Sequence, residues 1–359
     1  MELGLFAIFS IYFIGAVIFS LFVNSIFLRF SKNLGIRDRN GNTVRWSSES
    51  KPALGGIAFY IVFLLSFTGY STFYSEGDIT ENSAFTGLLV ATAVAFVMGL
   101  ADDAYNTRPV LKFFVQVLCG VILISTGTCI ELFDTPWINY LITVVWVVGM
   151  MNSINMLDNM DAITSVVSIG IMVAALIYLL LHGMTDSVDF FVLLGVLASL
   201  VGFLFFNWNP SKLFMGDTGS QFLGIFLAFI GIRFFWNAED IAGNLYGSKQ
   251  FIIAVIVFLL PLSDTTTVVI NRLSRGNSPF IGGKDHTTHH LSYLGLSDSQ
   301  VALSFAGLSM VSVFISYVLI KFFGDWDNTH FFLFALYALL IFVGLFVTTK
   351  ISRPRNESK

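Results

Sequence analysis

Charged residues are scarce in this chain of 359 residues. Asp, Glu, Lys and Arg make up 12% of it and apolar residues 55%, with 39 Phe among them, whereas about a quarter of an ordinary soluble domain is charged. The mean hydropathy of +0.79 agrees with this imbalance. The composition excludes an ordinary soluble domain and predicts a protein that crosses a membrane several times.

Three further absences narrow the class of protein. The only cysteines, Cys119 and Cys129, match no metal-binding or redox spacing, so we expect packing roles for both. A formal net charge of −4 provides no broadly basic surface, so we expect no nucleic-acid partner. Arg29 and Lys32, not a small-residue cleavage site, follow the first apolar run, which predicts a retained span instead of a cleaved signal peptide.

Apolar runs long enough to cross a bilayer as helices recur along the whole chain. We count about eleven and predict an all-α polytopic membrane protein, with residues 1–359 forming one integral-membrane domain. The predicted spans are 3–28, 54–74, 84–101, 110–127, 137–154, 164–181, 190–206, 221–236, 251–270, 301–322 and 331–349.

Most of the 19 Lys and Arg fall in alternate connections between these spans. The positive-inside rule makes that side cytoplasmic, with the N-terminus outside and the C-terminus cytoplasmic. The segments expected on that side are the loops 29–53, 102–112, 155–163, 207–220 and 271–300 and the tail 350–359.

The unusual carboxylates lie in or beside these same cytoplasmic segments. Asn155, Asp158 and Asp161 end an apolar run, and ionisable groups near the bilayer are costly unless they have a function. If this stretch is helical, its i,i+3 spacing places a row of hard oxygen ligands on one face, which predicts a divalent cation. The adjacent Asp102 and Asp103 fit either a helix end with solvated charges or a metal ligand beside a general base.

Asp217 lies between two glycines in a predicted turn before the eighth span. Because acidic residues from other segments converge on the same side, we expect it to hold Mg²⁺ that in turn binds a pyrophosphate. Hard oxygen ligands favour Mg²⁺ over Zn²⁺.

Cationic groups and imidazoles accompany the acids. Lys51, in a Lys-Pro-x-x-Gly-Gly turn, is either a topology signal or a phosphate ligand, and Lys112 either snorkels or binds an anionic lipid headgroup. His286, His289 and His290 fit either phosphate-binding imidazoles or a solvated loop.

Taken in order, these motifs resemble the polyprenyl-phosphate N-acetylhexosamine-1-phosphate transferases, and most closely the undecaprenyl-phosphate GlcNAc-1-phosphate transferase type. The resemblance covers nearly the whole chain. It is carried by Lys51-Pro-x-x-Gly-Gly, Asp102-Asp103 with Lys112 and Gln116, Asn155-x-x-Asp158-x-x-Asp161, Met215-Gly-Asp217-x-Gly-Ser, Pro261-x-x-Asp264, Arg272 and the His286–His290 motif.

The resemblance implies transfer of a sugar-1-phosphate from a UDP-sugar to undecaprenyl phosphate, with release of UMP. It also implies Mg²⁺, with Mn²⁺ as a possible substitute, and a site on the cytoplasmic face of a bacterial inner membrane. The implied catalytic residues are Asp102, Asp103, Asp158 and Asp161; the implied metal ligands are Asp217 and Asn155; and the implied substrate-binding residues are Lys51, Lys112, Asn155, Asp264, Arg272, His286, His289 and His290.

Two positions depart from the family pattern. The family often has Asp-Gly-x-Asp-Gly where this chain has Asp158-Asn159-Met160-Asp161-Ala162, which leaves the backbone less free to bend. The common His-x-His-His-Arg motif has Thr288 and His290 in place of its second His and its Arg.

The related translocase of peptidoglycan synthesis typically has ten spans and a consecutive His triplet, so about eleven spans, a cytoplasmic tail and an interrupted His motif resemble the GlcNAc-1-phosphate type more closely. That resemblance implies UDP-GlcNAc as donor and the start of a cell-wall or lipopolysaccharide glycan. Another UDP-N-acetylhexosamine or UDP-MurNAc-pentapeptide is the alternative, and a homodimer stays open. A membrane transporter is the alternative from another class, but transporters favour midplane sites and internal repeats. Here the acids gather at one interface and no repeat is visible.

Overall fold

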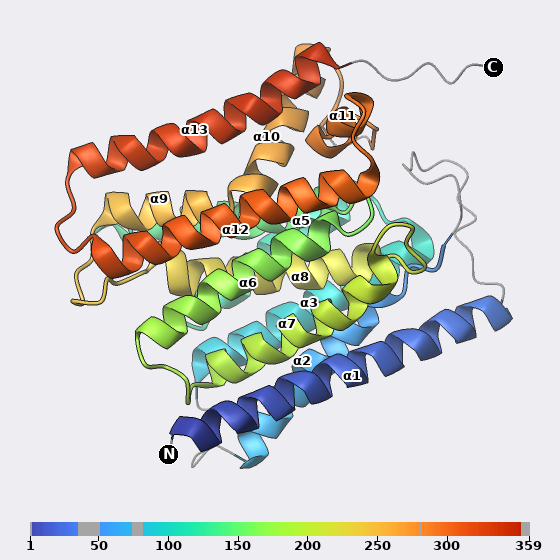
Figure 1. The fold of residues 1–359 in the computed structure, drawn as a ribbon, viewed down its shortest axis with the longest axis horizontal. Coiled ribbons are helices and arrows are strands. Elements are labelled where there is room, and N and C mark those ends of the chain that lie inside the picture. The colour runs from blue at the N-terminus through green and yellow to red at the C-terminus, as the bar shows by residue number, and fades with distance from the viewer. Residues whose placement is uncertain (1, 35–50, 74–81, 280–281, 353–359) are drawn as a thin grey trace.

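The computed structural model describes residues 2–34, 51–73, 82–279 and 282–352, and all regular structure within these ranges is helical. The prediction of an all-α protein is therefore confirmed for them. Most helices lie side by side in one bundle, with the start of α1 and the end of α13 at opposite ends of it (Figure 1).

The helices, in chain order, are α1 (Glu2–Leu34), α2 (Gly55–Phe73), α3 (Ser83–Tyr105), α4 (Pro109–Ser125), α5 (Pro136–Leu157), α6 (Ile163–Leu181), α7 (Val188–Asn207), α8 (Gly216–Gly231), the π-helical turn η2 (Ile232–Trp236), α9 (Gly247–Val257), α10 (Leu259–Ser274), α11 (Thr287–Tyr293), α12 (Asp298–Phe322) and α13 (Asn328–Ile351).

Every predicted span coincides with one of these helices or with a pair of them. Among the described residues, nine helices are long and apolar enough to cross a membrane, and the bent pair α9 and α10 makes a tenth if it forms one span. The remaining predicted span is α4, a shorter apolar helix of 17 residues. The chain is thus a multi-pass membrane protein, while the count of eleven and the side on which each terminus lies stay predictions.

Two predicted boundaries are wrong. The span at 251–270 is not one helix, because α9 and α10 meet at 77° around Phe258. Pro261 explains the break, since its ring cannot donate the hydrogen bond that would continue α9 and is tolerated in the first turn of a new helix. The loop expected at 271–300 contains the short helix α11. Most of the predicted loop 29–53 and tail 350–359 lies outside the described residues.

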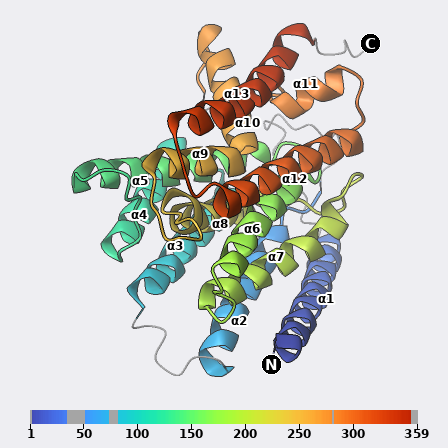
Figure 2. The ribbon, with the colours of Figure 1, turned by 60° about the vertical axis from the view of Figure 1, so that its left-hand side comes forward.

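Helix α8 lies at the centre of the bundle. It packs against α2, α3, α5 and α6 (Figure 2), and every residue from Thr218 to Ile232 is buried. A helix that is apolar on all sides is expected in such a position. The end of α8 that begins at Gly216 therefore has to be fixed by neighbouring segments and not by solvent.

Glycines let those segments approach closely. A Cβ atom on Gly56 would lie 2.1 Å from the backbone nitrogen of Gly219, and one on Gly99 would lie 2.4 Å from the carbonyl oxygen of Asp217. In addition, the N–H groups of Gly55 and Gly56 donate to the carbonyls of the two residues before α8, at 3.1 and 3.0 Å. Helices α2 and α3 thus hold the start of α8 in place.

We predict that Gly99→Ala destabilises the protein. The new methyl group would push α3 away from Asp217, and overpacking of this kind costs about 1–3 kcal/mol, more than the ~1 kcal/mol gained from the better helix former. Gly149→Ala in α5 is the matched control, because nothing lies within 4 Å of its would-be Cβ. Thermal unfolding in detergent should show a lower midpoint for Gly99→Ala alone, and equal midpoints for both variants would contradict the close approach.

Candidate active site

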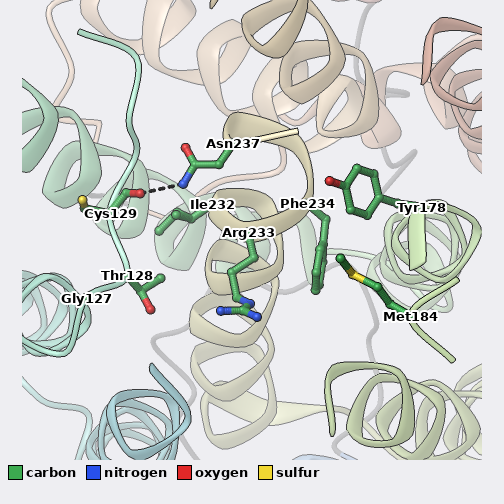
Figure 3. Close-up of a pocket in the computed structure, with 9 residues that line it drawn as sticks. All are labelled: Gly127, Thr128, Cys129, Tyr178, Met184, Ile232, Arg233, Phe234 and Asn237. Atoms are coloured by element: carbon green, nitrogen blue, oxygen red, sulfur yellow. Dashed lines mark hydrogen bonds between the residues drawn. The ribbon is translucent and has the colours of Figure 1, made fainter. Parts of the chain in front are cut away.

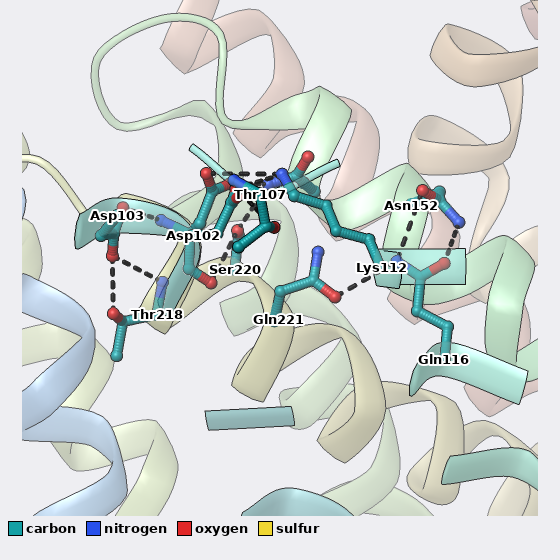
Figure 4. Close-up of polar contacts among 11 residues, drawn as sticks. Asp102, Asp103, Thr107, Lys112, Gln116, Asn152, Thr218, Ser220 and Gln221 are labelled. Atoms are coloured by element: carbon teal, nitrogen blue, oxygen red, sulfur yellow. Dashed lines mark hydrogen bonds and ion pairs between the residues drawn. The ribbon is translucent and has the colours of Figure 1, made fainter. Parts of the chain in front are cut away.

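Four helices bring one lysine, two carboxylates and one carboxamide together at the start of α8. Lys112 of α4 forms an ion pair with Asp102 of α3, and its Nζ lies 3.7 Å from Oδ2 of Asp217 in α8. Asn155 of α5 donates through Nδ2 to Asp217 and, at 2.9 Å, to the hydroxyl of Ser220. Lys112 thus lies between two acids, and Figure 4 shows it beside Asp102.

The two acids differ in their access to solvent. The Asp102 side chain is 2% exposed, whereas those of Asp217 and Lys112 are 31% and 23% exposed. Asp102 also accepts hydrogen bonds from the backbone N–H and the hydroxyl of Thr107, at 2.7 and 2.6 Å. Asp102 therefore holds Lys112 from the buried side, while Asp217 and Lys112 are partly exposed.

Asp103, predicted to be catalytic, caps the first turn of α8. Its carboxylate accepts from the N–H of Asp217 at 2.8 Å, and from the N–H and hydroxyl of Thr218 at 2.9 and 2.6 Å (Figure 4). Gly216, whose φ is +76°, makes room for it, because a Cβ there would lie 2.9 Å from a carboxylate oxygen of Asp103. The sequence predicted that Asp217 lies in a turn before the helix. In the structure it belongs instead to the first turn of α8.

The prediction that Asn155, Asp158 and Asp161 lie on one face of a helix is wrong. Helix α5 ends at Leu157, Asp158 caps it, and the chain then turns through Ala162, whose φ of +66° is left-handed. Asn155 therefore joins Asp217, while Asp161 points elsewhere. A single helical face would have required α5 to continue for four more residues.

Asp161 anchors the segment before α8. It is buried and accepts from the N–H and hydroxyl of Ser211, at 2.9 and 2.7 Å, and from the amide of Asn209 at 3.0 Å. Lys51 reaches the same place, since its Nζ donates to the Ser211 hydroxyl at 3.3 Å and lies over the Phe214 ring. The structure thus groups Lys51 with Asp161 and separates both from the Asp217 cluster.

Asp264 of α10 fixes the start of α11. It is fully buried and accepts from Nδ1 of His286 at 2.8 Å, and from the N–H and hydroxyl of Thr287 at 2.8 and 2.6 Å. A short helix of seven residues has little stability of its own. The buried carboxylate supplies the anchor and orients the His286 ring.

Arg272 closes the loop before α11. It makes two parallel hydrogen bonds to Asp285, at 2.8 and 2.7 Å, and a third to the carbonyl of Pro279 at 2.8 Å. Burial alone would raise the pKa of Asp285, but the hydrogen bonds and charge of Arg272 outweigh it and hold that pKa below its usual range. Arg272 therefore shapes this loop, and its predicted contact with substrate stays a prediction.

The remaining members of the His motif also hold α11 in place. His290 pairs through Nδ1 with the hydroxyl of Ser352 at the end of α13, at 2.6 Å. Thr288 donates to the side-chain oxygen of Asn159 at 2.6 Å, so the turn after α5 is joined to α11. Burial, followed by the charge of His286, lowers the pKa of His289 to about 3, so that its ring is neutral near pH 7.

The donor set at the start of α8 fits a weakly held magnesium ion. Among the residues that the structure describes, no three His, Cys, Asp or Glu side chains converge on a metal-sized space, which argues against a closed protein cage. Mg²⁺ typically binds one or two carboxylates and completes its shell with water and substrate phosphates. Asp217 and the carbonyl oxygen of Asn155 could serve as such a partial set.

A separate cavity of about 250 Å³ lies at the opposite end of α4, beyond the other end of α8 (Figure 3). Its lining includes Arg233 and Tyr178 but none of the predicted site residues. The charge of Arg233 is already paired with Asp189 at 2.7 Å. We therefore assign the active site by the converging charges around Lys112 and not by the size of this cavity.

Sequence reasoning passed over several side chains in the network. Ser220 and Thr218 bind Asn155 and Asp103, and Asn152 and Gln221 form further amide contacts below Lys112 (Figure 4). Gln221 carried a detectable signal, because it is a polar residue in an apolar span, one helical turn after Asp217.

The part of the chain that contains the cluster is similar to a family of known proteins. Residues 85–235, which run from α3 to η2 and contain the whole Lys112 cluster, match glycosyl transferase family 4. A probable undecaprenyl-phosphate N-acetylglucosaminyl 1-phosphate transferase of Bacillus subtilis is 27% identical over 92% of this chain and 89% of its own.

Two other relatives differ in their named reactions. A decaprenyl-phosphate N-acetylglucosaminephosphotransferase of Mycobacterium leprae is 29% identical over 70% of this chain and 69% of its own. A phospho-N-acetylmuramoyl-pentapeptide-transferase of Kosmotoga olearia is 27% identical over 82% of this chain and 94% of its own. All three are named as transferases.

We predict that Asp103→Ala lowers the free energy of unfolding by about 0.5–2 kcal/mol, because three donors at the half-buried start of α8 lose their acceptor. Asp103→Asn, which keeps one acceptor oxygen, should lose less. The measurement is the unfolding midpoint of both variants in detergent. A purely chemical role would instead abolish turnover in both and leave the midpoint unchanged.

We also predict that His289 makes the protein less stable in acid. Its folded pKa of about 3 lies below the unfolded value near 6.5, so the unfolded chain binds more protons between these values and stability falls as the pH drops through this window. Between pH 7 and pH 5 the wild type should lose about 2 kcal/mol more than His289→Gln. Identical pH dependence of unfolding in the two proteins would rule this out.

Proposed function

We propose that this chain is a polyprenyl-phosphate sugar-1-phosphate transferase, and that it transfers GlcNAc-1-phosphate from UDP-GlcNAc to undecaprenyl phosphate. The transfer would release UMP and begin a cell-envelope glycan. We place the site on the cytoplasmic face of the bacterial inner membrane, where the positive-inside rule puts the connections that carry it.

The observation that carries the proposal is the placement of Lys112 between Asp102 and Asp217. Both reactants of this transfer are phosphate esters, so the site has to gather negative charge and keep it in line for displacement. Lys112 is the half-buried cation of the cluster, and Asp102 fixes its position from the buried side. An incoming phosphate can therefore pair with Lys112 while the protein keeps its geometry.

In the proposed reaction, an oxygen of the lipid phosphate attacks the β-phosphorus of the UDP-sugar. The bond from that phosphorus to the bridging oxygen breaks, and the electron pair leaves with UMP, so the product is a polyprenyl diphosphate sugar. Lys112 would neutralise the lipid phosphate, and Asp217 with Asn155 would hold Mg²⁺. When bound, Mg²⁺ would offset the charge that develops on the phosphate oxygens.

Several other predicted site residues hold the segments around the charged cluster in position. Asp103 and Asp161 have their oxygens engaged in holding α8 and the segment before it. The anchored His286 lies on the segment that Thr288 joins to the turn after α5. We propose that this segment contacts the diphosphate or the sugar of the donor, with a neutral His289 acting through hydrogen bonds and not through charge.

The choice of UDP-GlcNAc rests on two kinds of support. The relatives from Bacillus subtilis and Mycobacterium leprae are named for N-acetylglucosamine transfer, and the His motif is interrupted by Thr288. UDP-MurNAc-pentapeptide is the competing donor, because a relative of similar identity is named for it.

We predict that detergent-purified protein, supplied with Mg²⁺ and undecaprenyl phosphate, releases UMP from UDP-GlcNAc. UDP-GalNAc and UDP-MurNAc-pentapeptide are tested in parallel, and EDTA or omission of the lipid should abolish release. Asp217→Asn should reduce turnover by roughly 10²–10³-fold, on the scale of losing one group that stabilises transition-state charge. Asp327→Asn is the matched control, because that exposed residue caps α13 and lies outside the site.

Each outcome of this assay decides a separate point. Release from UDP-MurNAc-pentapeptide alone would replace the donor but keep the reaction. Wild-type turnover in Asp217→Asn would remove Asp217 from the metal site. No release from any donor by folded protein would overturn the proposed function.

A further inference from the structure

Three carboxamides, two of them buried and one half-buried, lie directly beneath the charged cluster. Gln116 of α4, Asn152 of α5 and Gln221 of α8 form a connected set (Figure 4), in which Gln116 and Gln221 are each 1% exposed. We call these residues the amide triad. Asn152 donates to Gln116 at 2.7 Å and Gln116 donates back at 3.4 Å, while the Gln116 amide also donates to the Gln221 carbonyl oxygen at 3.2 Å.

Each residue of the amide triad lies about one helical turn from a residue of the charged cluster on the same helix. Gln116 follows Lys112 by four residues on α4, Gln221 follows Asp217 by four residues on α8, and Asn152 precedes Asn155 by three residues on α5. Residues with this spacing lie on the same face of a helix. Each amide therefore lies on the face of its helix that also carries one residue of the cluster.

This placement matters most for α4. The buried residues of α4 are Gln116, Cys119, Gly120 and Leu123, so the stripe that attaches this helix to the bundle begins at Gln116. Lys112 lies beyond that stripe, at the partly exposed end. The rotation and axial position of Lys112 relative to Asp217 therefore depend on how Gln116 is held.

Hydrogen-bonded amides hold a helix differently from apolar side chains. Apolar packing tolerates small shifts as long as volume is conserved, whereas a buried amide loses its partner and stays unsatisfied when the helix slides or turns. The reciprocal pair between Gln116 and Asn152 and the bond to Gln221 tie α4 to α5 and α8 at one register. In that register, Nζ of Lys112 lies 3.7 Å from Oδ2 of Asp217.

We propose that Gln116, Asn152 and Gln221 are positioning residues, which set the relative placement of Lys112, Asn155 and Asp217 for phosphoryl transfer. The expected loss of turnover rests on the proposed function. The expected change in how firmly Lys112 is held rests on the geometry alone. None of the three amides is assigned a contact with substrate.

The test uses variants that keep side-chain volume. Gln116→Met and Gln221→Met remove the amide from the triad at nearly constant size. We expect kcat for UMP release to fall by roughly 10- to 100-fold in each, on the scale reported for a displacement of about 1 Å between reacting groups, with little change in KM for the UDP-sugar. The double variant should lose no more than the worse single variant, because both changes break one network.

Asn139→Leu is the matched control. Asn139 is an amide on α5, as Asn152 is, and it is buried with its own hydrogen bonds to the Leu132 and Phe133 backbone, but it lies at the other end of the helix. This variant should lower the unfolding midpoint as much as the Met variants and leave kcat within about twofold of wild type. If the Met variants behave like Asn139→Leu in both measurements, the triad only stabilises the fold and the proposal is overturned.

A second measurement separates this inference from the proposed function. The rate at which an amine-reactive reagent labels Lys112, followed by peptide mass spectrometry, reports how firmly Asp102 and Asp217 hold that ammonium, and it requires no turnover. Faster labelling in Gln116→Met and Gln221→Met, but not in Asn139→Leu, supports the triad even if wild type releases no UMP. Unchanged labelling together with unchanged kcat overturns it.

Discussion

The half-buried start of α8 is the constraint on which the site depends. The first N–H groups of any helix have no partner within the helix, and here a side chain of a neighbouring helix satisfies two of them. The carboxylate of Asp103 accepts from two of these N–H groups and from the hydroxyl of Thr218. Because Asp217 follows directly from this cap, the position of the proposed metal ligand is set by a neighbouring helix.

The acidic residues of the family motifs accordingly divide into two groups. Asp103, Asp161 and Asp264 are engaged by backbone N–H groups and hydroxyls, and each fixes the start of a helix or of the segment before it. Asp102 and Asp217 flank Lys112 instead. A high density of carboxylates at one end of a membrane protein therefore reflects the architecture as much as the chemistry, because every buried helix end there needs an acceptor.

Much of the fold could be predicted from the sequence, because the length of an apolar run and the thickness of a bilayer determine where helices lie. The sequence also predicted one polar cluster, because it placed the unusual polar groups on one side of the membrane, among them Asp102, Lys112, Asn155 and Asp217. The division of labour among them could not be predicted, since it depends on contacts between distant segments. The turn after α5 shows this, because the left-handed Ala162 directs Asp161 towards Ser211 and away from Asp217.

The two departures from the family pattern are connected by a single contact. In sequence, Asn159 replaces a glycine and Thr288 replaces a histidine, and each alone suggests a loss. In the structure their side chains form a 2.6 Å hydrogen bond that joins the turn after α5 to α11. A glycine at position 159 has no side chain to make this contact, so the hydrogen bond requires both Asn159 and Thr288. The helix that carries the histidines is therefore held to the turn after α5 by a contact that neither motif reveals by itself.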